Sequence, residues 1–179
     1  IILLTNETKN NVIIYDKSGK LINTWGTEYP GAHGLTLFNE NGADVLFICD
    51  NNRHQVIKTT IDGRVLLTLN YPKETGQYTK AEEYVPTETI IAPNGDIYVA
   101  DGYGKDFIIQ YDAQGNYIRH FGGRGDGDRF LLNAHGICID NRDKNKPCLI
   151  TTSRMQNAFK RFTMEGIYID TIPLPGAWV

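Results

Sequence analysis

The stretch that decides the fold is Asn11-Val-Ile-Ile-Tyr-Asp-Lys-Ser-Gly-Lys-Leu-Ile-Asn-Thr-Trp-Gly26, and it returns as Phe107-Ile-Ile-Gln-Tyr-Asp-Ala-Gln-Gly-Asn-Tyr-Ile-Arg-His-Phe-Gly122. Two weaker copies begin at Gln55 and Phe159. Each copy has two apolar runs around a D-x-x-G or similar turn, in which glycine supplies the positive φ that the turn needs. Each copy therefore predicts a pair of antiparallel strands.

A second repeated unit lies upstream of three of these hairpins. It starts as Ala32-His-Gly-Leu-Thr-Leu, Pro86-Thr-Glu-Thr-Ile-Ile and Ala134-His-Gly-Ile-Cys-Ile, and it continues through a turn into an apolar strand. Together the two units give four short strands per repeat without helical periodicity, which is typical of a β-propeller blade. A β-sandwich would also use short strands, but it would not repeat its turn chemistry at a fixed phase. We therefore predict an all-β propeller of four-stranded blades.

The repeats fill one predicted domain over residues 1–179. Its parts are a blade end over 1–26, blades over about 27–70, 84–122 and 130–172, and the start of a further blade over 173–179. Six blades of about 40–45 residues need on the order of 250 residues. Because the chain also begins with Ile1 and stops soon after a Pro-Leu-Pro-Gly turn, we expect a longer protein with six blades, of which about four are present.

Composition and charge exclude several classes of protein. The chain has 18 Lys and Arg against 21 Asp and Glu, so it has no excess positive charge for a nucleic acid partner. No apolar run approaches the roughly 20 residues that span a bilayer, so we expect no transmembrane segment. The 3 cysteines are too few and too irregularly spaced for a disulfide framework or a CxxC zinc site.

Histidines recur at one position of the repeat. His33 and His135 both stand in Ala-His-Gly two repeats apart, and Thr87 occupies that position in the repeat between them. Innermost strands line the central channel of a propeller, so alternate blades of a six-bladed ring place such histidines a third of a turn apart. Three imidazoles with an open fourth position are typical of catalytic zinc. We therefore predict zinc at His33 and His135, with a third histidine about 100 residues further on.

Other readings of the histidines and loops stay open. Either channel imidazole could instead cap a loop through a backbone carbonyl, and His54 and His120, at other phases, are expected at the surface. Residues 70–85 form a longer, tyrosine-rich connection that we interpret as a recognition lid or a disordered surface loop. Residues 122–129 contain an Arg-Gly-Asp tripeptide but are interpreted as a plain connection between blades. Asn6-Glu-Thr8 is a glycosylation acceptor only in a secreted eukaryotic chain.

The repeat resembles the NHL repeat, and the order of its motifs resembles the peptidyl-α-hydroxyglycine α-amidating lyase family, a six-bladed NHL propeller whose catalytic zinc is held by three channel histidines. The resemblance covers almost the whole chain. Its carriers are Ala32-His33-Gly34-Leu35, His54-Gln55-Val56, Pro86-Thr87, Val99-Ala100-Asp101-Gly102-Tyr103, Asn133-Ala134-His135-Gly136 and Ser153-Arg154.

The resemblance implies a role for five residues. His33 and His135 match two zinc ligands, Tyr103 matches a tyrosine that serves as zinc ligand or catalytic base, and Arg154 matches an arginine of the substrate site. The backbone carbonyl of Leu35 matches one that meets a structural calcium. The implied activity is that of a zinc-dependent lyase, which cleaves the C–N bond of a carbinolamide into an amide and glyoxylate. The substrate, a small molecule or peptide, would lie in the channel, and the setting would be extracytoplasmic or secreted.

Several positions depart from the family pattern. The third histidine and the acidic residue after it would follow Val179. An arginine of the substrate site should fall near residues 4–6, where this chain has Leu-Thr-Asn. A disulfide-forming cysteine is replaced by Gly104, and an aspartate of the fourth unit by Ser153. These departures indicate a divergent relative whose substrate can differ from an amidated peptide.

Two rival functions remain. A non-catalytic propeller would present its faces to protein or carbohydrate partners and keep its histidines for structure. A lactonase-like calcium hydrolase would need Glu, Asn and Asp ligands in the channel, where the inner-strand starts here offer histidine. A further histidine in the same phase would favour the zinc enzyme over both.

Overall fold

The computed structural model describes residues 1–5 and 9–176, and these residues form an all-β fold. The Asn6-Glu-Thr8 glycosylation acceptor lies outside the described residues. The same holds for residue 6, where the family has an arginine of the substrate site, and for residues 177–179 of the predicted further blade. Strands run antiparallel to their neighbours in four separate sheets. The prediction of an all-β propeller of short-stranded blades, partly present in this chain, is confirmed.

One sheet has three described strands and three sheets have four. The three-stranded sheet contains β1 (Ile2–Leu4), β2 (Val12–Tyr15) and β3 (Leu21–Trp25). The next contains β4 (Ala32–Glu40), β5 (Ala43–Asp50), β6 (Gln55–Thr60) and β7 (Val65–Leu69). The third contains β8 (Glu88–Ile91), β9 (Ile97–Ala100), β10 (Phe107–Tyr111) and β11 (Tyr117–Gly122). The last contains β12 (Ile137–Asp140), β13 (Cys148–Ser153), β14 (Ala158–Thr163) and β15 (Tyr168–Pro173).

The turn chemistry of the repeat fixes the outer hairpin of each sheet. In the first, Gly19 has a φ of 86°, and the Asp16 carboxylate accepts hydrogen bonds from the backbone N–H groups of Ser18 and Lys20. Gly115 takes the same conformation in the third sheet, with a φ of 85°. The register of every outer hairpin shifts at the corresponding place, at Tyr15, Thr59, Tyr111 and Phe162. The repeated sequence therefore produces repeated geometry.

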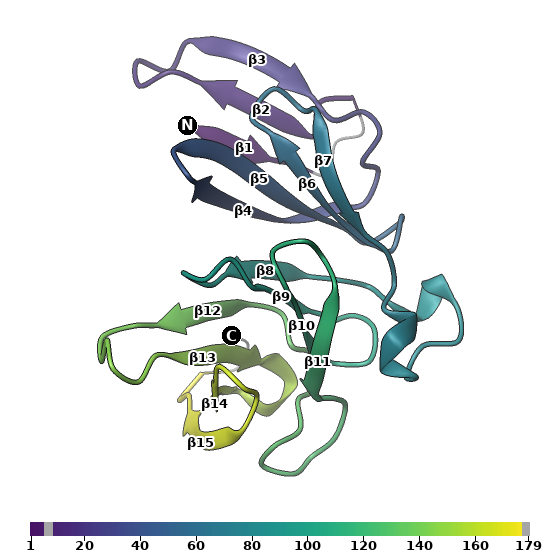
Figure 1. Ribbon diagram of the computed structural model, residues 1–179, viewed down its shortest axis with the longest axis vertical. Coiled ribbons are helices and arrows are strands. Elements are labelled where there is room, and N and C mark those ends of the chain that lie inside the picture. Colours follow the sequence, from purple (N-terminus) through teal and green to yellow (C-terminus); the bar gives the residue numbers. More distant parts are fainter. Residues whose placement is uncertain (6–8, 177–179) are drawn as a thin grey trace.

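The four sheets follow one another in chain order, from the N-terminal sheet at the top of Figure 1 to the C-terminal sheet at the bottom. Contacts between successive four-stranded sheets include those of β4 with β8 and of β8 with β12, the first strand of each sheet. Apolar clusters fill the spaces between sheets, so an interior sheet is covered on both faces. This is why β9 is buried along its whole length and reads as a continuous apolar run.

The connection over residues 70–85 is ordered and packed. It forms the 3₁₀ helices η1 (Lys73–Thr75) and η2 (Ala81–Glu83). Tyr78 and Tyr84 are buried and belong to the apolar cluster between the second and third sheets. The alternative of a disordered surface loop is therefore wrong, because Tyr78 and Tyr84 pack into the core. The recognition lid stays a prediction.

Gly34 and Gly136 occupy the same position of the repeat but differ in the space around them, which allows a test of the inner-strand packing. A Cβ added at Gly34 would lie 2.4 Å from the carbonyl oxygen of Thr87 on the next sheet, whereas one added at Gly136 would meet only the Thr152 side chain at 3.7 Å. We expect Gly34→Ala to lower the free energy of unfolding by about 1–3 kcal/mol through overpacking. Gly136→Ala is expected to change it by less than about 1 kcal/mol. Urea unfolding monitored by tryptophan fluorescence measures both, and equal losses would contradict this account of the interface.

Candidate functional site

Three predicted site residues from three successive sheets converge on one point. His33 comes from β4, Tyr103 from the turn after β9, and His135 from the segment just before β12. The Tyr103 hydroxyl oxygen lies 2.8 Å from Nε2 of His135 and 3.3 Å from Nε2 of His33. The two imidazole centroids are 4.9 Å apart. The structure thus brings these three side chains into mutual contact, although Tyr103 is separated from His33 by 70 residues along the chain.

Thr87 sets the protonation of the His33 ring. Its carbonyl oxygen lies 2.9 Å from Nδ1 of His33, and because a carbonyl only accepts, Nδ1 must carry the proton. In the tautomer with the proton on Nδ1, Nε2 presents a lone pair toward Tyr103. Sequence analysis offered the alternative that a channel histidine bonds a backbone carbonyl. Nδ1 of His33 makes such a bond, and Nε2 of the same ring stays available to a ligand. Thr87 itself stands at the repeat position that histidine holds in the two neighbouring sheets.

His135 lies half-buried beside positive charge. Burial lowers the pKa of His135, and the nearby His33 and Arg154 lower it further because a second positive charge is unfavourable there. Arg154 begins the 3₁₀ helix η3 (Arg154–Gln156) and is half-buried. The structure therefore places the fourth predicted site residue near the histidine pair, where its charge favours a neutral, ligand-competent imidazole at His135.

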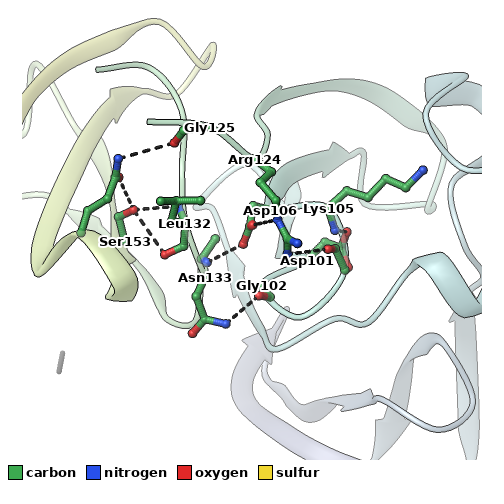
Figure 2. Close-up of polar contacts among 12 residues, drawn as sticks. Asp101, Gly102, Lys105, Asp106, Arg124, Gly125, Leu132, Asn133 and Ser153 are labelled. Atoms are coloured by element: carbon green, nitrogen blue, oxygen red, sulfur yellow. Dashed lines mark hydrogen bonds and ion pairs between the residues drawn. The ribbon is translucent and has the colours of Figure 1, made fainter. Parts of the chain in front are cut away.

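The turn that carries Tyr103 is fixed by a buried carboxylate. Asp101, immediately after β9, accepts hydrogen bonds of 2.6 Å from the Tyr78 hydroxyl and from the backbone N–H groups of Val85 and Lys105. Burial raises the pKa of Asp101 to about 7, against the lowering effect of these bonds. Figure 2 shows Asp101 beside Lys105 within this polar network. Tyr103 itself remains 41% exposed, so a ligand can reach its hydroxyl from solvent.

Sequence analysis did not identify Glu88, whose carboxylate lies close to the candidate site. Glu88 follows Thr87 where the other two inner strands have Gly34 and Gly136. Its carboxylate accepts a hydrogen bond of 3.1 Å from the Thr36 hydroxyl and one of 3.0 Å from the backbone N–H of Thr89. Burial raises the pKa of Glu88. Glu88 thus flanks the β4 segment that contains Leu35, the predicted calcium position, and the break in the Gly pattern was the signal for it.

The donor set can be compared with what zinc requires. Ligand atoms about 2.0–2.1 Å from a tetrahedral zinc lie about 3.3 Å from one another. The Tyr103 oxygen lies 3.3 Å from Nε2 of His33, which equals that separation, and 2.8 Å from Nε2 of His135, which is a hydrogen-bond distance. Two imidazoles and a phenol oxygen are suitable ligands, so the residues present fit part of a zinc centre. Within residues 1–5 and 9–176, however, no group of three His, Cys, Asp or Glu side chains is placed to hold a metal.

The other histidines and the Arg-Gly-Asp arginine form contacts within the protein. His54 and His120 are partly exposed to solvent. Nδ1 of His54 is bonded to the Tyr84 carbonyl, and Nδ1 of His120 to the Tyr117 hydroxyl. In the predicted connection between blades, Arg124 forms an ion pair of 2.8 Å with Asp106. Arg124 is thus engaged within the fold, which disfavours an adhesion role for the Arg-Gly-Asp tripeptide. None of the described helices is long and apolar enough to cross a membrane.

Comparison with known proteins extends the resemblance found in the sequence. No family model matches the chain. The probable peptidyl-alpha-hydroxyglycine alpha-amidating lyase pgal-1 of Caenorhabditis elegans is 32% identical over 120 residues, which are 65% of this chain and 32% of that protein. Peptidyl-alpha-hydroxyglycine alpha-amidating lyase 1 of Drosophila melanogaster is 34% identical over 109 residues, 59% of this chain and 19% of that protein. The chain therefore spans a third or less of the length of these relatives.

Solved structures with the same fold include other lyases. A streptogramin B lyase superposes with a TM-score of 0.67 at 16% identity, over 97% of this chain and 54% of that one. Virginiamycin B lyase from Staphylococcus aureus, in its inactive H270A form with quinupristin, gives 0.62 at 17% identity, over 97% and 55%. At such identities the likeness concerns the fold. The chain is therefore a partial β-propeller that resembles the peptidyl-α-hydroxyglycine α-amidating lyases in sequence.

Proposed function

We propose that this chain carries part of the active site of a zinc-dependent lyase that cleaves the C–N bond of a carbinolamide such as a peptidyl-α-hydroxyglycine, in a six-bladed NHL propeller. The observation that carries the proposal is the convergence of Nε2 of His33 and Nε2 of His135 on the hydroxyl oxygen of Tyr103. The names of the sequence relatives support the reaction class.

His33 and His135 would hold the zinc through Nε2. Bound zinc would supply a Lewis acid that polarises the hydroxyl oxygen of the substrate. The Thr87 carbonyl keeps the proton of His33 on Nδ1, which leaves Nε2 free to bind metal. The lowered pKa of His135 keeps its ring neutral, as a metal ligand must be.

Tyr103 would move the proton. Cleavage of a carbinolamide removes the proton of the substrate hydroxyl, forms the carbonyl of the aldehyde product, breaks the C–N bond and returns a proton to the amide nitrogen. A phenolate at Tyr103 would accept the first proton and, as the phenol, deliver it to the leaving nitrogen, so the reaction is balanced without a co-reactant. Its exposure to solvent, at 41%, lets a substrate reach the oxygen.

Arg154 would bind the carboxylate of the substrate. A guanidinium can grip a carboxylate through two parallel hydrogen bonds, which fixes the orientation of the neighbouring carbon. Arg154 lies near enough to His135 to lower the pKa of that ring, so its charge acts on the same site. It would therefore select substrates that end in a carboxylate.

Calcium is a second part of the proposal. The carbonyl of Leu35 would bind it, and the Glu88 carboxylate beside the same segment of β4 offers the hard oxygen ligand that calcium prefers. The substrate would be a small molecule or peptide, and an extracytoplasmic or secreted setting remains a prediction drawn from the sequence resemblance.

Metal binding gives the first test. We expect one zinc per molecule of the complete six-bladed protein, with His33→Ala and His135→Ala each weakening binding at least about 10-fold because each removes a ligand. His120→Ala, which removes a half-buried imidazole on the outermost strand β11, serves as the control and should leave binding unchanged. Isothermal titration and metal analysis measure this. Zinc binding that survives in both channel variants would favour the non-catalytic scaffold.

Turnover gives the second test. Tyr103→Phe keeps the ring and removes the proton-transferring oxygen, so kcat for a peptidyl-α-hydroxyglycine should fall about 100- to 10,000-fold. Zinc binding through the two histidines should persist in this variant. Glyoxylate release measures the rate. Full activity in Tyr103→Phe would assign the proton transfer to another group.

Substrate selection gives the third test. Arg154→Gln should raise KM for a substrate with a free carboxylate by about 10-fold or more, because a charge-assisted pair is lost. The same substitution should change KM little for the corresponding amide, which carries no charge. Kinetics with the matched acid and amide decide the point, and an equal effect on both would remove carboxylate binding from the role of Arg154.

A further inference from the structure

Two side-chain hydrogen bonds join the turn that carries Tyr103 to the segment that carries His135. The side-chain amide of Asn133 donates to the carbonyl of Gly102 at 2.9 Å, and the backbone N–H of Ala134 donates to the Asp106 carboxylate at 3.0 Å. Figure 2 shows both bonds crossing between the two segments. Gly102 immediately precedes Tyr103, and Ala134 immediately precedes His135. The bonds therefore end next to the two residues whose side chains meet.

The residues that make these bonds are held in unusual backbone conformations. Asn133 has a φ of 60° and Asp106 a φ of 64°, in the left-handed region where asparagine and aspartate are the non-glycine residues found most often. Asp106 is fully buried, and Arg124 binds its second oxygen at 2.8 Å, so both carboxylate oxygens are occupied. Backbone strain of this kind persists only where surrounding contacts maintain it.

We infer that Asn133 and Asp106 are positioning residues, which hold the Tyr103 hydroxyl at Nε2 of His135 without touching a substrate. The inference rests on the proposed function for its catalytic consequence. Its structural part is independent of any metal, since the bonds lie within the protein. Nδ1 of His33 is held separately, by the Thr87 carbonyl, so the loss of Asn133 or Asp106 should disturb the contact of Tyr103 with His135 and spare the bond of His33 to Thr87.

The first experiment uses Asn133→Gly, which removes the amide and tolerates the positive φ. Nitrogen-15 NMR of the histidine rings in the metal-free chain should show Nε2 of His135 losing its hydrogen-bonded shift. Nδ1 of His33 should keep its own. Asn41→Gly is the matched control, because Asn41 has a φ of 52° in the turn between β4 and β5. In the lyase assay, kcat of Asn133→Gly should fall about 10-fold with KM unchanged.

A second pair of variants decides the matter if Asn133→Gly does not fold. Asp106→Gly removes the acceptor for Ala134 and keeps the positive φ, whereas Asp106→Asn keeps an oxygen for the same N–H. The His135 shift should be lost in Asp106→Gly and largely retained in Asp106→Asn. Ring signals that match the Asn41→Gly control in both Asn133→Gly and Asp106→Gly would overturn the inference. An absence of lyase activity in the complete six-bladed protein that contains this chain would refute the proposed function and leave this NMR result to judge the positioning role.

Discussion

Thr87 makes the contact on which the arrangement of the site depends. Its carbonyl accepts a hydrogen bond from Nδ1 of His33 in the preceding sheet, and its hydroxyl donates to the carbonyl of Ala134 in the following sheet at 3.0 Å. One fully buried residue thus joins the inner strands of three sheets. A buried hydroxyl or carbonyl without a partner is costly, so these bonds restrict how the sheets can rotate against one another. That restriction orients His33 directly, and it acts on the His135 segment together with the bonds of Asn133 and Asp106.

The repeat pattern was sufficient to predict the fold and the phase of the histidines. The paired copies at residues 11–26 and 107–122 predicted the outer hairpins, because an aspartate and a glycine at fixed spacing leave the chain few turns to choose from. His33 and His135 share one position of the repeat, so equal geometry in each sheet brings them to the same inner edge. Their convergence needed no knowledge of side-chain contacts.

The contacts between sheets could not be predicted in the same way. Asn133 and Glu88 interact with segments 31 and 52 residues away, respectively, and no local pattern reports such distances along the chain. The tyrosines of residues 70–85 were misread because their polar neighbours resemble a surface loop, whereas Tyr78 and Tyr84 fill the space between two sheets. Side chains that pack between repeats depend on the neighbouring repeat, and local periodicity describes only one repeat at a time.

The glycines of the inner strands connect packing to the site. A Cβ added at Gly102 would lie 2.2 Å from the carbonyl oxygen of Ala134, just as one at Gly34 would meet that of Thr87. Gly34 follows His33, and Gly102 precedes Tyr103. Both of these close approaches thus occur one residue from a side chain of the site, at a position where only glycine leaves room. A residue larger than glycine at either position would therefore separate the sheets and the site groups together, because the same contact determines both.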